Sequence, residues 1–239
     1  MNKTRSFSIV GLGLLAMVLT LAWSPMVYGQ SFPDGTTVKE TLHNLRRSAV
    51  GPMPVEDYGE ICVYCHTPHN SNTAVAAPLW NRTAPAGPYT MYSSPTLDMT
   101  IDPSPGGVTL ACLSCHDGTI GVDVIINEPF SYSGSGAKAG TIGACAGCHD
   151  GDSPPGGLNF EGTLIGTDLS NDHPVSIQYD PTADSKFHPA ADVVSAGLPL
   201  YVANRVECGS CHDPHSAQWR PFLRMSNDDS AMCLTCHNI

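Results

Sequence analysis

The sequence predicts a mostly irregular chain with a few short α-helices and very little β-structure. The 239 residues include 23 glycines and 20 prolines, roughly 18% of the chain against about 12% in average usage. Stretches such as 83–105 and 130–143 are rich in Pro, Gly, Ser and Thr, which favour turns over helices or ladders. Such a chain would struggle to bury enough apolar surface by itself. We therefore expect something other than side chains to complete its core.

The ten cysteines all fall into five copies of one pattern, Cys-x-x-Cys-His. In chain order, motifs 1 to 5 are Cys62/Cys65/His66, Cys112/Cys115/His116, Cys145/Cys148/His149, Cys208/Cys211/His212 and Cys233/Cys236/His237. This pattern is typical of covalent haem attachment. The two thiols form thioethers with the vinyl groups of one porphyrin, and the histidine becomes the proximal ligand of the iron. The sequence therefore predicts five covalently bound haem c groups, with the polypeptide wrapped around them.

Three other uses of paired cysteines fit the pattern less well. Zinc sites pair two Cys-x-x-Cys units, or one unit with a distant histidine pair, and need no histidine after every second cysteine. Thioredoxin-like chemistry uses one such unit near a βαβ pattern. Disulfides across a two-residue loop would be strained and would connect nothing distant.

We expect each motif to sit on a short helical turn, because that geometry brings both sulfurs to one porphyrin edge. The polar run 227–230 resembles a capping segment and predicts a helix over 231–237. A second helix is predicted over 37–48 and a short strand over 122–126. The 25-residue interval between motifs 4 and 5 predicts that their haems are direct neighbours.

Five histidines lie outside the motifs, one for each predicted haem: His43, His69, His173, His188 and His215. An electron-transfer haem needs a second axial ligand, normally His or Met, whereas a catalytic haem keeps that side open. His173 and His188 precede prolines, while His69 and His215 follow them, so four of the five sit on stiff, extended backbone. Because His69 and His215 stand three residues after a proximal histidine, each is expected to reach a neighbouring haem. We therefore expect these five side chains to be the distal iron ligands and every iron to be closed.

Methionine is the alternative distal ligand. The candidates are Met53, Met91, Met99, Met225 and Met232. We expect them mainly to pack, since methionine fills irregular apolar gaps well. Trp80, Trp219 and Tyr64 are likewise expected to be packing residues.

Residues 1–29 have the features of a secretory signal peptide, with Lys3 and Arg5 before an apolar run over 9–22. An uncleaved membrane anchor is the alternative, although the run is short for a span. No later stretch is apolar enough to cross a bilayer, so residues 30–239 are expected to form one secreted domain, in the periplasm, at the cell surface or outside the cell. Without Lys3 and Arg5 the basic residues fall from 11 to 9 against 22 acidic ones, a formal charge of −13. That charge excludes nucleic acid as a partner and suits basic protein patches or cations, or it only keeps the protein soluble.

The chain resembles the multihaem c-type cytochromes of metal-reducing bacteria, which include small tetrahaem members that form extracellular filaments. The resemblance rests on 43–45 (His-Asn-Leu), 62–69, 112–118, 172–175 (Asp-His-Pro-Val), 207–215 and 233–237. It implies that these histidines are axial ligands and that the chain transports electrons through the periplasm, to the cell surface or along filaments. Its partners would then be redox proteins or extracellular metal acceptors. Motif 3 departs from the four-haem pattern, and a small pentahaem periplasmic donor to a reductase is the nearest alternative.

An electron carrier with five bis-histidine haems is the leading functional hypothesis. A filament subunit, a homopolymer in which His43 ligates a haem of the next copy, is a variant of it. A nitrite, hydroxylamine or tetrathionate reductase is the enzymatic alternative. The balanced histidine count and the lack of any altered motif such as Cys-x-x-Cys-Lys argue against it, so we expect no catalytic residues.

Overall fold

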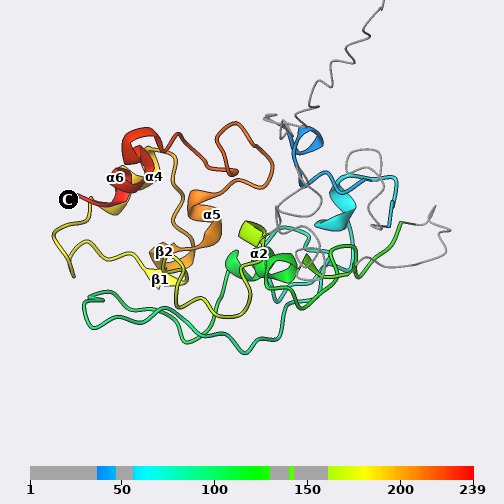
Figure 1. The fold of residues 1–239 in the computed structure, drawn as a ribbon, viewed down its shortest axis with the longest axis horizontal. Coiled ribbons are helices and arrows are strands. Elements are labelled where there is room, and N and C mark those ends of the chain that lie inside the picture. Colours follow the sequence, from blue (N-terminus) through cyan, green and yellow to red (C-terminus); the bar gives the residue numbers. More distant parts are fainter. Residues whose placement is uncertain (1–36, 47–55, 130–139, 143–160) are drawn as a thin grey trace, which may run out of the picture.

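The computed structural model describes residues 37–46, 56–129, 140–142 and 161–239, and irregular backbone dominates it (Figure 1). The described helices are α2 Thr109–His116, α4 Ala190–Ser195, α5 Cys208–Cys211 and α6 Ala231–Cys236. Single 3-10 turns are η1 Val38–Glu40, η2 Cys62–Tyr64, η3 Glu161–Thr163, η4 Val202–Asn204 and η5 Asp228–Ser230, and the strands are β1 Ile177–Gln178 and β2 Arg205–Val206. The predicted fold class, irregular chain with short helices and little β-structure, is confirmed.

Four of the five Cys-x-x-Cys-His motifs lie on helical turns, as predicted. Motif 1 forms η2, motif 2 ends α2, motif 4 forms α5 and motif 5 ends α6. Motif 3 lies outside the described residues. The predicted C-terminal helix is α6, and Asn227 caps it by accepting a hydrogen bond from the backbone N–H of Met232 at 3.2 Å.

Two predicted elements are wrong in the described part of the chain. In place of a helix over 37–48, only η1 forms, and it ends at Thr41, whose backbone is extended. The Thr41 hydroxyl bonds to the carbonyl of Val38, and the Asn44 amide bonds to that of Lys39, so polar side chains compete with helix bonds. Residues 122–126 form no strand. The Val122 carbonyl instead accepts a side-chain hydrogen bond from Arg82.

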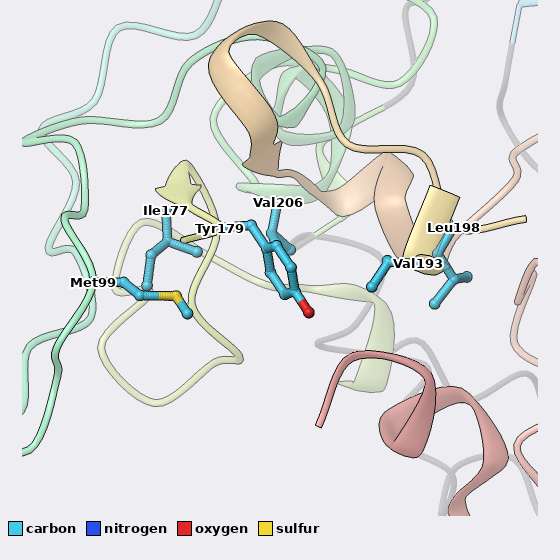
Figure 2. Close-up of a cluster of buried hydrophobic side chains, with 6 residues drawn as sticks. All are labelled: Met99, Ile177, Tyr179, Val193, Leu198 and Val206. Atoms are coloured by element: carbon cyan, nitrogen blue, oxygen red, sulfur yellow. The ribbon is translucent and has the colours of Figure 1, made fainter. Parts of the chain in front are cut away.

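The largest apolar cluster lies beside the one small sheet that the structure describes. Strands β1 and β2 pair antiparallel, with Ile177 opposite Val206. Figure 2 shows the cluster that continues from this pair toward the end of α4. Its buried members are Met99, Ile177, Tyr179, Val193, Leu198 and Val206, and Met225 and Met232 pack against it. These three methionines therefore have the packing role predicted for them.

Two smaller clusters lie near motifs 1 and 2. One contains Tyr58, Tyr64 and Val122, and the other Val75, Trp80 and Ala111. Tyr64 and Trp80 thus pack as predicted, whereas Trp219 is 38% exposed. No helix within the described ranges is both long and apolar enough to cross a membrane.

Candidate haem-binding site

The histidines of motifs 1, 2 and 4 are each held by a segment that returns to the motif. The Nδ1 atoms lie 2.6 Å from the Pro78 carbonyl for His66, 2.7 Å from that of Thr163 for His116 and 2.9 Å from that of Pro221 for His212. A carbonyl can only accept, so Nδ1 carries the proton and Nε2 keeps its lone pair. In metal sites, a hydrogen bond of this kind to a ligating histidine fixes its tautomer. The three imidazoles therefore keep the Nε2 lone pair available to a metal ion.

Three of the predicted distal histidines face a motif histidine. The ring centres are 6.1 Å apart for His66 and His215, 6.2 Å for His116 and His43, and 6.4 Å for His237 and His173. With iron–nitrogen bonds of about 2 Å and ring centres roughly 1 Å beyond each nitrogen, two axial imidazoles of one iron have ring centres about 6 Å apart. The observed separations match that requirement at three motifs.

Two of these distal histidines also have a fixed Nδ1. Nδ1 of His43 lies 3.0 Å from the Pro214 carbonyl, and Nδ1 of His173 lies 3.1 Å from that of Pro174. Burial lowers the pKa of His43 to about 4, and burial also lowers the pKa of His116 and of His237. These imidazoles are neutral at pH 7, which is the form that ligates a metal.

The thiols of different motifs lie close to one another. A hydrogen bond to Cys208 and burial raise the pKa of Cys112. Burial raises the pKa of Cys65 to about 12, with a further rise from neighbouring Cys115. Burial, then the nearby Cys208 and Cys233, raises the pKa of Cys211. Motifs 2 and 4 therefore meet at the hydrogen bond between Cys112 and Cys208. The thiols of motifs 1 and 2, and those of motifs 4 and 5, are near enough for one to raise the pKa of the other.

Glu207 connects motifs 2 and 4, and it was not among the predicted site residues. The side chain is 2% exposed and accepts hydrogen bonds from the Thr109 hydroxyl at 2.5 Å and the Ser176 hydroxyl at 3.0 Å. It also forms a capping box with Ser210 of α5. The only sequence signal was a glutamate three residues before a serine at the start of a short helix.

The donor set fits covalent haem better than the alternative uses of cysteine. The eight described cysteines are free in the structure. Each of the four described motifs has its histidine directly after the second cysteine, a feature that a zinc site or a disulfide does not need. The paired imidazoles have ring centres 6.1, 6.2 and 6.4 Å apart, the spacing that two axial ligands of one haem iron need.

The remaining predicted ligands are not brought into pairs. Cys145, Cys148 and His149 of motif 3 lie outside the described residues. Among the residues that are described, His69, His188 and His212 have no histidine ring opposite them, and His69 is exposed. His43 faces His116 of its own chain.

Comparison with known proteins bears on the C-terminal part of the chain. Residues 201–238, which contain motifs 4 and 5, match the family described as the doubled CXXCH motif. A search of curated proteins finds no match to the chain. Residues 201–238 thus form a c-type-cytochrome-like haem-binding region.

Proposed function

We propose that the chain is an electron carrier in which all five motifs bind haem c and the irons are closed by two imidazoles. The ring separations of 6.1, 6.2 and 6.4 Å carry this proposal. They assign His215 to the haem of motif 1, His43 to that of motif 2 and His173 to that of motif 5. His69 and His188 remain for the haems of motifs 3 and 4.

We further propose that four haems follow one another in the order of motifs 1, 2, 4 and 5. The hydrogen bond between Cys112 and Cys208, and the electrostatic effects of Cys115 on Cys65 and of Cys233 on Cys211, support this order. Figure 1 agrees, because α2, α5 and α6 follow one another along the longest axis of the molecule toward the C-terminus. Such a series would allow an electron to enter at one end and leave at the other.

The chain's own residues would orient the groups and keep substrates off the irons. A bound haem supplies one-electron chemistry at its iron. The carbonyls of Pro78, Thr163 and Pro221 hold Nδ1 protons and so aim Nε2 at the metal. A distal imidazole then fills the position that a reductase would leave open. This arrangement favours a carrier over an enzyme.

Location and partners follow from the sequence-based expectations. We propose a secreted protein, in the periplasm, at the cell surface or outside the cell, that exchanges electrons with redox proteins or extracellular metal acceptors. The formal charge of −13 after residue 29 favours partners with basic surfaces. Since His43 has a partner within its own chain, we favour a single-chain carrier over a homopolymer. A donor to a periplasmic reductase fits the same geometry.

Electron paramagnetic resonance of the oxidised holoprotein tests the carrier proposal. Mass spectrometry first counts the covalent haems, for which we expect five. The ferric spectrum should then be low-spin throughout, and negative-stain microscopy should show monodisperse particles. An abundant high-spin ferric signal would contradict closed irons, and regular filaments would restore the homopolymer.

A further inference from the structure

Arg82 is a fully buried cation whose hydrogen-bond partners are all neutral. The side chain is 0% exposed. Nε donates to the Ser114 hydroxyl at 3.2 Å, Nη1 to the Val122 carbonyl at 2.8 Å, and Nη2 to the carbonyls of Ser114 at 2.9 Å and Gly121 at 2.8 Å. None of these four bonds goes to a carboxylate. A buried charge normally has an ionised partner, because desolvating it alone is costly.

The residue before Arg82 binds the neighbouring motif. Asn81, also 0% exposed, donates from its amide to the Val63 carbonyl at 2.7 Å, and its backbone N–H donates to the Cys65 carbonyl at 2.8 Å. Val63 lies between the two cysteines of motif 1, and Ser114 lies between those of motif 2. Asn81 therefore holds the attachment loop of motif 1, and the guanidinium of Arg82, the next residue, holds that of motif 2.

The charge of Arg82 reaches both motifs. Nε and Nη2 both donate to Ser114, between the two cysteines of motif 2. Arg82 also directly follows Asn81, which is bonded to Val63 and Cys65 of motif 1. The guanidinium therefore contacts motif 2 directly and is held beside motif 1 by the residue next to it.

We infer that Arg82 is a positioning residue that raises the reduction potentials of the haems at motifs 1 and 2. Reduction adds one electron to a ferric iron and lowers the charge of the site by one, so a fixed positive charge nearby favours the ferrous state. A protein interior screens this interaction far less than water does. The inference rests on the proposed attachment of haem at these two motifs.

The test is a potentiometric titration of Arg82→Gln holoprotein, with the individual haems resolved by nuclear magnetic resonance of their methyl protons. We expect the haem of motif 2, whose attachment loop accepts two of the Arg82 hydrogen bonds, to become about tenfold harder to reduce, a downward shift of about 59 mV. The haem of motif 1 should shift in the same direction by less. Arg82→Lys keeps the charge and should keep both potentials near the wild-type values. Lys186→Gln removes the same charge from an exposed site and should move no potential comparably.

A second variant leaves Arg82 in place. Ser114→Asp puts a carboxylate where Nε now donates to a hydroxyl, so it should lower the same two potentials. This variant decides the question if Arg82→Gln does not yield haem-loaded protein. The inference would be overturned if Arg82→Gln or Ser114→Asp protein, with five haems attached, kept the wild-type potentials at motifs 1 and 2. A wild-type protein without covalent haem at these motifs would instead overturn the proposed function.

Discussion

At the scale of single residues, His215 carries the most direct consequence of the ring pairs. Its ring centre lies 6.1 Å from that of His66, with 15° between the ring planes. We expect His215→Ala to open one iron and to convert one of five low-spin ferric signals to high-spin, while all haems stay covalently attached. Electron paramagnetic resonance measures the ferric spin states, and mass spectrometry counts the covalently attached haems. Gln218→Ala, an exposed position nearby, is the control, and a fully low-spin spectrum of His215→Ala would remove His215 from the ligand set.

Asn81 is a buried neutral side chain whose removal should lower the stability of the protein. Its amide donates to the carbonyls of Val63 and Asn127, and its Oδ1 accepts the backbone N–H of Asn127 at 2.9 Å. Asn81→Ala leaves these buried groups unpaired and should lower the free energy of unfolding by about 3 kcal/mol. Guanidinium unfolding of the holoprotein measures it. The exposed Asn171 is the matched site, where Ala should change the stability by less than about 0.5 kcal/mol; equal effects at the two sites would refute the argument.

At the scale of elements, Glu207 makes the link between α2 and α5 sensitive to pH. Burial raises the pKa of its carboxyl above the ordinary 4.5, against hydrogen bonds from Thr109 and Ser176 that lower it. The folded state therefore holds this proton more tightly than the unfolded state. Its stabilising contribution is complete below pH 4.5 and is lost as the pH rises through the folded-state pKa.

Glu207→Gln removes this titration and keeps a hydrogen-bonding amide of the same shape. Denaturant unfolding at each pH measures the free energy of unfolding of both proteins. Relative to the wild type, that of the variant should rise as the pH rises from 4.5 to 7. Glu60→Gln, at an exposed glutamate, should show no such trend. A stability difference that is constant over this range, or that moves the other way, would contradict a raised pKa at Glu207.

The sequence was sufficient for the elements that local chemistry decides. Spacing alone placed the helical turns at Cys62, Cys208 and Cys233, because two thiols and an imidazole must meet one porphyrin. It failed over 37–48 and 122–126, where side chains from elsewhere take the backbone groups, as Arg82 does at Val122. The five distal histidines were predicted as a set, but the motif histidine that each one faces was not. His43 and His116 are 73 positions apart, and only the folded chain brings their rings together.

At the scale of the whole molecule, the apolar clusters are too small and too separate to hold the chain together. The described residues bury six side chains in the cluster beside the sheet and three in each of the other two. Fixing a backbone of this length costs on the order of 1 kcal/mol or more per residue, and such clusters do not offset that. In the described residues, the segments that hold the motif histidines meet their motifs through isolated bridges, as at His66 and Trp80, and through single hydrogen bonds.

The protein without haem should therefore not fold. We expect haem-free chain, produced without the attachment machinery and with its thiols kept reduced, to lack a helical circular dichroism signal and a cooperative thermal transition. Adding free haem should not restore the transition fully, because ring pairs such as His66 and His215 would form without the thioethers that fix their register. The covalently loaded protein is the control and should melt cooperatively. Cooperative melting of the haem-free chain would mean that side-chain packing alone forms the core, and the role assigned to the haems in folding would fail.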